Sequence, residues 1–461
     1  MCLLSADKLE FSQLAAKGMR TLDYWEGRLT AIPSTIECVE MRLLSGHDDE
    51  PPIFVGPGCI NIKSSTYIDF TMFATPTDDG EAVRRLVRAQ ENPYEVVDQF
   101  RLFATDYQGT EWACGWTQPN LKGIPKIGWP LKGSLNSLVT HATGPWVSAE
   151  SGVELVFLPK LRLPMDKAMV TITSVDGEEI ERRHSAGQQT VQVLNSEITF
   201  FYKPTEESLW VTMKTSDKLQ HPYAENWLSE PLRILLGQLA FPRLVARNLG
   251  DGTAQVWIRP SPRHVGDSGI ASLISGDLYH SREEFWALYS SLLTLIAEAR
   301  DEQGHPNFES HRITRFYEEI IQATQGSKWV LSMTLASVGE GLAKMLMRPE
   351  DLKSDYAAKD IESLKAAVAG WEGDNGLRDR ILSDIANAGK RSIGKFLRDL
   401  VQCGVLEIRN ASAWSAVRNA VMHGNLVSPW GTEKEDKRLL GLADLVHQLT
   451  RELIQRSKES M

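Results

Sequence analysis

Two hydrophobic patterns divide the chain. Up to about residue 260, short segments alternate apolar and polar residues with a period of two, which is typical of half-buried strands. The clearest are 36–43, 59–63 and 67–73. From Ser281 onward, apolar residues recur at three- and four-residue spacing, which predicts helices. The sequence therefore predicts an α+β protein, with a β-rich, sandwich-like N-terminal domain and an all-α C-terminal bundle.

Turn-forming residues place the domain boundaries. Gly, Pro and Ser are frequent between 261 and 276, where the strand pattern ends. We predict a β-rich domain over 1–260, a linker over 261–280 and a helical region over 281–461, with a core at about 325–457. Ser281-x-x-Glu284 matches a capping box at the first helix. Later helices are predicted at about 308–323, 328–347, 356–370, 376–387, 391–403, 411–423 and 433–457.

One stretch of the N-terminal region, 110–147, is rich in tryptophan, with Gly and Pro between the indoles. A tryptophan-rich loop region can grip a ligand by stacking. The same residues can instead be core and rim aromatics of a sandwich. We favour the second interpretation, because Trp buries a large apolar area wherever it lies. The four residues are Trp112, Trp116, Trp129 and Trp146.

Composition narrows the class of protein. A chain of 461 residues with 42% hydrophobic and 24% charged residues is typical of a soluble protein of two or three domains. No apolar run is long enough to span a bilayer, and the N-terminus becomes polar at Ser5. We therefore expect a cytoplasmic protein without a signal peptide. The five cysteines are few and widely spaced, which predicts reduced thiols, and we expect neither a metal site nor a cofactor.

The net charge of −10 is unfavourable for binding to a polyanion. The charge is unevenly distributed, however. Residues 325–461 contain 20 Lys and Arg against 18 Asp and Glu, or +2, and the remainder contains 30 against 42, or −12. The segment 388–420 is locally cationic, which favours contact with a polyanion.

The candidate chemistry lies at the end of the helix predicted at 411–423. The sequence there is Arg418-Asn419-Ala-Val-Met-His423-Gly424. Gly is the usual residue that ends a helix, so the motif lies on the last turn. Five residues correspond to 140° of helical rotation, so Arg418 and His423 reach one phosphate only if the helix bends or frays there. The helix C-terminus favours protonated His and Arg418 opposes it, which suits His423 to acid–base chemistry.

Arg-Asn-x-x-x-His at a helix end, in an all-helical C-terminal context, resembles the motif of the HEPN superfamily, many of whose members are metal-independent ribonucleases. The resemblance covers roughly the last 140–170 residues. The layout, with a long β-rich region before the helical domain, resembles the ApeA family of anti-phage defence proteins. The resemblance implies a HEPN endoribonuclease of abortive infection. A phage-derived trigger would activate it to cleave host RNA, with tRNA as the favoured substrate, and it would act as a homodimer or higher oligomer.

The same resemblance assigns roles to the motif residues. His423 transfers protons, Arg418 holds the scissile phosphate, and Asn419 orients the phosphate or the imidazole. The expected products carry a 2′,3′-cyclic phosphate and a 5′-hydroxyl. From the residues themselves, Glu340 either orients Arg418 from a neighbouring helix or faces solvent, and Trp414 is a core residue. Candidate RNA contacts are Lys390, Arg391, Lys395 and Arg398, the last three on one helical face at i, i+4 and i+7.

Two alternatives stay open. In one, the protein is a non-catalytic HEPN dimerisation and binding protein, in which Arg418 forms a structural salt bridge and His423 caps the helix. In the other, it is the toxin of a toxin–antitoxin pair. The first alternative predicts that changes at Arg418 and His423 affect only stability.

Overall fold

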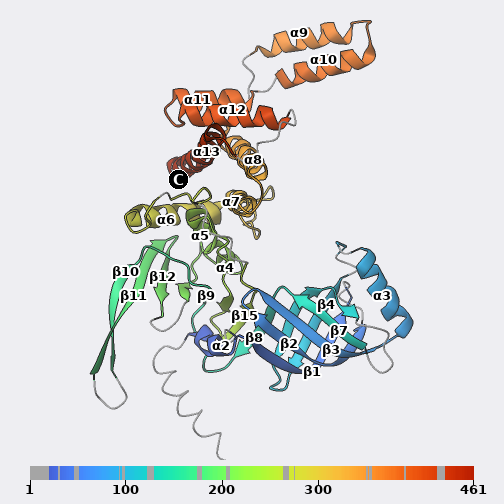
Figure 1. Ribbon diagram of the computed structural model, residues 1–461, viewed down its shortest axis with the longest axis vertical. Coiled ribbons are helices and arrows are strands. Elements are labelled where there is room, and N and C mark those ends of the chain that lie inside the picture. The colour runs from blue at the N-terminus through green and yellow to red at the C-terminus, as the bar shows by residue number, and fades with distance from the viewer. Residues whose placement is uncertain are drawn as a thin grey trace, which may run out of the picture. The chain divides into compact units, whose positions relative to one another are not determined.

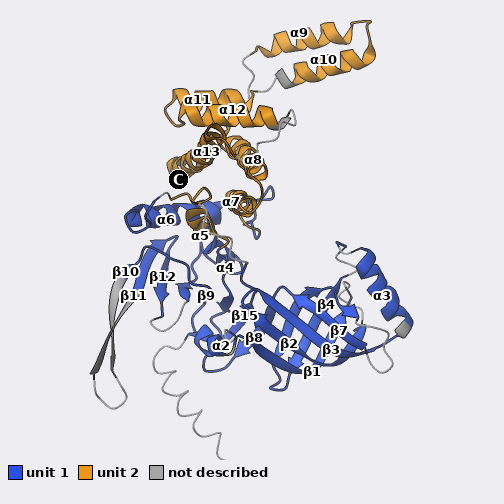
Figure 2. Cartoon of the chain, viewed as in Figure 1, with its two compact units in different colours: residues 1–230, 240–264, 276–308 blue, residues 231–239, 265–275, 309–461 orange. Residues whose placement is uncertain are grey.

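The structure is a computed structural model of the 461-residue chain. It describes residues 20–29, 32–45, 51–92, 94–95, 99–121, 129–173, 179–203, 208–262, 269–274, 276–348, 351, 356–388, 391–422 and 431–460. The chain forms two compact units that interleave along the sequence (Figure 2). Unit 1 contains 1–230, 240–264 and 276–308, and unit 2 contains 231–239, 265–275 and 309–461.

Unit 1 is built on an antiparallel sheet whose fifteen strands follow the order β10-β11-β12-β13-β9-β14-β15-β8-β5-β4-β1-β2-β3-β7-β6 (Figure 1). The strands are β1 (Ser34–Leu44), β2 (Phe54–Ser64), β3 (Tyr67–Pro76), β4 (Phe100–Asp106), β5 (Glu111–Thr117), β6 (Asn120–Leu121), β7 (Trp129–Leu135), β8 (Leu138–Thr143), β9 (Gly152–Phe157), β10 (Asp166–Thr173), β11 (Glu179–Val193), β12 (Ser196–Tyr202), β13 (Leu209–Lys214), β14 (Leu244–Asn248) and β15 (Thr253–Ile258).

The prediction of a β-rich region followed by a helical region is confirmed. The described strands join one continuous sheet, however, where the pattern predicted a sandwich-like arrangement. The reason is that β14 pairs with β9 while β15 pairs with β8, so one hairpin bridges the two halves. The far end of the sheet curls back on itself: Thr117 Oγ1 in β5 donates to the Ser134 carbonyl in β7 at 2.9 Å. Gly133 permits this approach, since a Cβ there would lie 2.6 Å from Thr117 Oγ1 and from the Phe70 ring.

Three of the four tryptophans lie on strands rather than in loops, Trp112 and Trp116 on β5 and Trp129 on β7. Trp112 is buried in the core of unit 1, and Trp129 packs against that core. Trp116 is 37% exposed and lies beneath the Arg101 guanidinium, 5.4 Å from its ring centre. The core-and-rim interpretation is confirmed for these three residues.

Helix α2 (Thr21–Leu29) is anchored to the sheet by a buried carboxylate. Glu154 in β9 accepts hydrogen bonds from the Thr21 and Leu22 amides at 3.0 and 2.8 Å and from Asn248 Nδ2 at 2.9 Å. Burial raises the pKa of Glu154, while these hydrogen bonds oppose the rise. Helix α2 packs on β14 and β15, and its Trp25 and Leu29 join the core of unit 1.

Unit 1 also contains α3 (Asp79–Glu91), α4 (Ala224–Trp227) and α6 (Arg282–Glu298). Helix α6 buries Phe285, Trp286 and Tyr289, and the Trp286 indole donates to the Pro164 carbonyl at 2.8 Å. Residues 276–308 therefore belong with the strands, although the sequence pattern grouped 281–308 with the later helices. The predicted capping box is wrong in one part: Ser281 is the N-cap residue, but at φ −99° and ψ 23° its side chain makes no cap hydrogen bond.

Unit 2 is helical. Its elements are α5 (Glu230–Leu236, of which Glu230 belongs to unit 1), α7 (Arg312–Ala323), α8 (Lys328–Leu346), α9 (Ala358–Ala369), α10 (Asn375–Ala388), α11 (Ile393–Gln402), α12 (Ile408–Met422) and α13 (Glu433–Ser460). Ser327 and Ser392 cap α8 and α11 by accepting the Val330 and Lys395 amides. Helices α8, α12 and α13 pack against one another and bury Leu335, Trp414 and Leu445.

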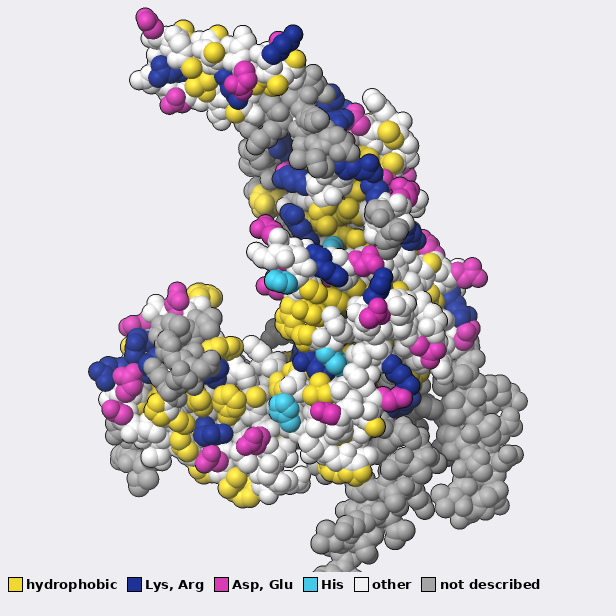
Figure 3. Space-filling model, turned by 180° about the vertical axis from the view of Figure 1, so that it is seen from behind, with side chains coloured by type: hydrophobic (Ala, Val, Ile, Leu, Met, Phe, Trp, Pro, Cys, Tyr) yellow, Lys and Arg dark blue, Asp and Glu magenta, His cyan; other side chains and the backbone are white. Residues whose placement is uncertain are grey.

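Helices α9 and α10 form a hairpin that packs mainly on itself (Figure 1). No side chain of α9 is buried, and Ile385 is the only residue buried among the described side chains of α10. Leu364, Trp371 and Leu377 are 52%, 43% and 48% exposed. In the space-filling view, the hairpin at the top carries hydrophobic side chains between charged ones (Figure 3). So little burial stabilises the hairpin only marginally.

We expect amide protons in the centre of α9 and α10 to exchange with solvent at least about a hundredfold faster than those in the centre of α8. The reason is that opening the hairpin exposes little apolar surface, whereas opening α8 disrupts the core of unit 2. Hydrogen–deuterium exchange followed by mass spectrometry measures both segments in one sample. Equal protection in the two segments would contradict this account of the hairpin.

Candidate active site

Helix α12 positions the predicted catalytic residues. Its buried face contains Asn410, Trp414 and Val417, at three- and four-residue spacing, and this face packs on α8 and α13. Arg418 and Asn419 are both exposed on the last described turn, Arg418 at the edge of the buried face, one turn after Trp414, and Asn419 opposite that face. His423 and Gly424 lie outside the described residues. The structure thus places two of the three predicted catalytic residues side by side at the surface.

Arg418 is held from the neighbouring helix α8. Its Nε lies 3.5 Å from Glu340 Oε2, at the limit of a hydrogen bond. Its guanidinium lies over the Trp414 ring, 5.6 Å from the ring centre. The contact with Glu340 was one of two arrangements left open by the sequence, and it is the one observed. Because the Arg418 side chain is 46% exposed, the guanidinium retains access to a ligand.

The carboxylate of Glu340 is shared between two cations. Lys344, one turn later on α8, lies 2.8 Å from Glu340 Oε1, while Arg418 approaches the other oxygen. The hydrogen bond from Lys344, and more weakly the charge of Arg418, lowers the pKa of Glu340. Glu340 is therefore ionised at neutral pH and acts as an acceptor for both side chains. Lys344 was not predicted from the sequence, although its i+4 spacing from Glu340 could have indicated it.

Trp414 forms the base on which Arg418 rests. Its side chain is 3% exposed, and its indole N–H donates to the Ala336 carbonyl at 3.0 Å. Gly339 allows α12 and α13 to approach α8 here, since a Cβ at Gly339 would lie 3.4 Å from Trp414 and 3.3 Å from Leu445. The prediction that Trp414 is a core residue is confirmed.

Of the three candidate RNA-contacting residues predicted to share one helical face, two lie on the helix and one precedes it. Lys390 lies outside the described residues. Arg391 precedes the N-cap of α11 and is engaged by Asp399 and, at 3.5 Å, by Asp351. Of the predicted i, i+4, i+7 series, Lys395 and Arg398 lie on α11, where Arg398 is exposed. The helix begins two residues too late to include Arg391, because Ser392 is the capping residue.

A groove of about 870 Å³ runs between α12 and the first turns of α13. Its floor contains the small residues Ala413, Ala416 and Gly441, and Leu440 is 54% exposed. Cationic side chains line it as well. Arg409 and Lys437 are paired with Glu407 and Glu433 at 2.6 and 2.7 Å. No ion pair among the described residues involves the other two cations of the groove, Lys434 and Arg438. Ala416 lies one turn before Asn419, so the groove runs along the helix that carries the motif.

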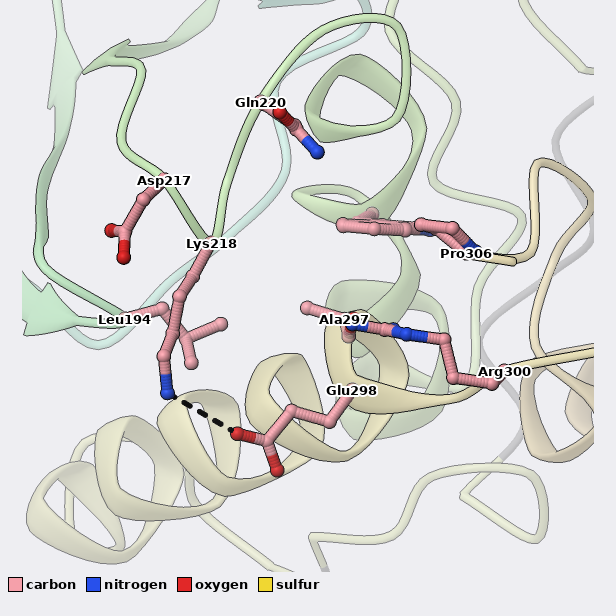
Figure 4. A pocket seen from close by; sticks show the side chains of 9 residues that line it. Leu194, Asp217, Lys218, Gln220, Ala297, Glu298, Arg300 and Pro306 are labelled. Carbon is pink, nitrogen blue, oxygen red and sulfur yellow. Dashed lines mark hydrogen bonds and ion pairs between the residues drawn. The ribbon is translucent and has the colours of Figure 1, made fainter. Parts of the chain in front are cut away.

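A second, smaller cavity of about 150 Å³ belongs to unit 1 (Figure 4). Lys218 Nζ lies 3.6 Å from Glu298 Oε1 across it, and Arg300 Nη1 donates to the Ala297 and Ala299 carbonyls at 2.9 Å each. Lys218, Glu298 and Arg300 therefore each have a partner in unit 1. The cavity contains none of the residues predicted to be catalytic.

Within the described ranges, no cluster of three or more His, Cys, Asp or Glu side chains is arranged to hold a metal ion. Cys38 and Cys114 are buried, Cys59 is half-buried and Cys403 is exposed, and all four are free thiols. Over the same ranges, no helix combines the length and apolar character that crossing a bilayer requires.

The chain was compared with known proteins. No family model matches it, and no curated protein or solved structure is significantly similar to it.

Proposed function

We propose that the protein is a HEPN-type endoribonuclease that cleaves RNA by attack of a 2′-hydroxyl on the adjacent phosphate, with Arg418, Asn419 and His423 as its catalytic residues. The observation that carries the proposal is the way in which Trp414 and Glu340 hold the Arg418 side chain. A buried Trp and an ionised Glu hold its guanidinium at the surface of the helical turn that ends one residue before His423. A guanidinium held in one position at the surface is preorganised to bind a phosphate.

The chemistry assigned to each group follows from its type. The planar guanidinium of Arg418 presents two parallel N–H donors to a phosphate and stabilises the charge that develops during attack. Only the Nε edge of Arg418 faces Glu340. Asn419, exposed beside it, can donate to a phosphate oxygen. His423 is the group whose ordinary pKa suits transfer of the 2′-hydroxyl proton and protonation of the leaving oxygen.

The groove along α12 favours a single-stranded substrate. Its apolar floor suits the face of an unpaired base, and Lys434 and Arg438 suit the phosphate backbone. Unpaired nucleotides also reach the in-line geometry that attack by a 2′-hydroxyl needs. We therefore propose RNA loops as the substrate class, with tRNA as the first candidate, and a cytoplasmic role in anti-phage abortive infection.

The motif contains one imidazole, His423, whereas the reaction needs one group to accept a proton and one to donate a proton. We propose that two copies of α12 face each other in a homodimer or higher oligomer, so that each site contains two motifs. A phage-derived component would activate the enzyme. The alternatives are a non-catalytic dimerisation and binding protein and the toxin of a toxin–antitoxin pair. The activity measurements below address the first of them.

Replacement of Glu340 by glutamine is expected to lower RNA cleavage about twofold to fivefold, because an exposed ion pair of this kind contributes only about 0.2–1 kcal/mol. The loss should fall on kcat rather than KM if Glu340 mainly orients Arg418 for the transition state. Single-turnover and steady-state cleavage of one RNA by the full chain separate the two constants. The matched control is Glu362→Gln, which removes the exposed pair with Lys365 on α9. An equal effect of both variants would contradict a positioning role for Glu340.

A further inference from the structure

A third cavity, of about 530 Å³, lies in unit 1 between α2, β1 and the turn that joins β4 to β5. Its apolar floor is formed by Trp25, Leu29 and Trp112. The two indoles are 5.8 Å apart between ring centres and nearly perpendicular, at 84°. Tyr107, at the tip of the turn, is 71% exposed and leaves most of its ring open to a ligand. The cavity is large enough for a side chain and part of a peptide, and larger than a single ion needs.

Two carboxylates line this aromatic cavity, and none of its described lining residues is Lys, Arg or His. Asp106 is fixed by neutral donors: its Oδ1 accepts the Gln108 and Thr110 amides at 2.9 and 2.8 Å, and its Oδ2 accepts from the Trp112 indole at 3.3 Å. Glu37 is exposed on β1. No ion pair among the described residues involves Asp106 or Glu37, so their negative charge is uncompensated there.

Two further observations concern the charge of Asp106 and the polar group of Trp25. Cys38, which pairs with Asp106 across β1 and β4, has a pKa raised to about 12, first by burial and then by the charge of Asp106. The negative charge of Asp106 therefore acts on the neighbouring Cys38 thiol. The indole N–H of Trp25, a side chain only 6% exposed, has no acceptor among the described residues. A buried N–H without an acceptor costs about 1–3 kcal/mol.

We infer that this cavity binds a basic side chain, of arginine or lysine type, presented by a peptide segment of a protein partner. Aromatic rings beside carboxylates attract an organic cation, since the ring faces and the carboxylates both carry negative charge. A hard metal ion would need six or more oxygen ligands, which aromatic walls do not supply. This inference concerns unit 1 alone and does not depend on the proposed nuclease activity.

The probe for this site is N-acetyl-arginine-N-methylamide, and its control is the citrulline analogue, which has nearly the same shape but no charge. We expect the arginine probe to change the tryptophan fluorescence of the full chain saturably, with a Kd on the order of 1 mM. The citrulline probe should bind at least about tenfold more weakly. Added salt should weaken the binding of the arginine probe.

Substitutions of residues that line the cavity test whether the probe binds there. Glu37→Gln should weaken the arginine probe about tenfold, and Tyr107→Ala about twofold to fivefold. Both side chains are exposed, so the variants should fold normally, which thermal unfolding checks. Glu40→Gln is the matched control: it removes an exposed carboxylate of the same strand, 50% exposed, that does not line the cavity. Equal binding of the two probes, unchanged binding in Glu37→Gln, or no saturable binding at all would overturn the inference.

Discussion

Replacement of Arg418 by alanine is expected to lower RNA cleavage by about 10²–10³-fold, or about 3–4 kcal/mol of transition-state stabilisation. The guanidinium lies at the surface, 3.5 Å from Glu340 and above Trp414, and the proposed reaction uses its donors on the phosphate. Stability should change by less than about 1 kcal/mol, because the pair with Glu340 is partly exposed. Initial rates on one RNA substrate, with thermal unfolding of both proteins, measure the two effects separately.

Two further variants sharpen this result. Arg418→Lys keeps the charge but loses the planar pair of donors, so its activity should lie between those of the parent protein and Arg418→Ala. Arg380→Ala removes an exposed cation from the α9–α10 hairpin and should leave cleavage unchanged. If all three variants cleave RNA as the parent protein does, while Arg418→Ala loses stability, then Arg418 is structural and the non-catalytic alternative is favoured.

The second large effect concerns acid stability. Burial lowers the pKa of His447 to about 4, and burial lowers the pKa of His311 to about 4 as well. His447 Nε2 donates to the Ile270 carbonyl at 3.0 Å and its Nδ1 lies 3.1 Å from the Tyr317 hydroxyl. His311 Nδ1 caps α7 by accepting the Ile313 amide at 3.2 Å. Both imidazoles are therefore neutral in the folded protein at neutral pH.

The sign of the pH dependence follows from these depressed values. In the unfolded chain each imidazole takes up a proton near its ordinary pKa of 6.5, whereas in the folded protein it does so only near pH 4. Between these values the unfolded state binds more protons, so stability falls as the pH falls from 6.5 toward 4. Fully developed below pH 4, the difference corresponds to roughly 3 kcal/mol for each residue, and roughly 2 kcal/mol of it is lost by about pH 5. Urea unfolding followed by far-UV circular dichroism, at pH 7 and at about pH 5, measures the loss.

A matched pair of variants tests the origin of this acid sensitivity. His311→Asn keeps a side chain that can cap α7 and removes the titrating group, so its stability should depend less on pH than that of the parent protein. His305→Asn replaces an imidazole that is 75% exposed and should leave the pH dependence unchanged. An identical pH dependence in His311→Asn and the parent protein would contradict the role of His311.

Much of the fold could be predicted from local pattern. The period-two segments became β1, β2 and β3, and the amphipathic segments became α8 and α13 with bounds close to those expected. The strands and α13 each bury one face, and α8 leaves only a narrow stripe exposed, so the apolar pattern of each element reflects its burial. The pairing of Glu340 with Arg418 was one of two arrangements predicted from the sequence, because a partly buried carboxylate in an otherwise apolar helix requires a partner.

Other features depend on contacts between residues distant in sequence. The stretch around Trp112 and Trp129 contains Gly and Pro that indicate loops, yet pairing with β4 and β3 makes it strand. The position of α6 in unit 1 depends on the burial of Trp286 against the sheet, which its helical pattern does not specify. Arg391 fitted a helical face by spacing alone, but Ser392 begins the helix after it. The Ser392 side chain accepts the Lys395 amide and so fixes where the helix starts.

The most direct test of the central claim is cleavage of total RNA and tRNA, in EDTA, by the full chain and by His423→Ala, with analysis of the product ends. The account predicts metal-independent cleavage that yields 2′,3′-cyclic phosphate and 5′-hydroxyl ends, and a loss of about 10²–10⁴-fold in His423→Ala. Extract from phage-infected cells supplies the trigger if the purified protein is latent. Cleavage that is equal in the two proteins, or no cleavage by either in the presence of that extract, would contradict the account.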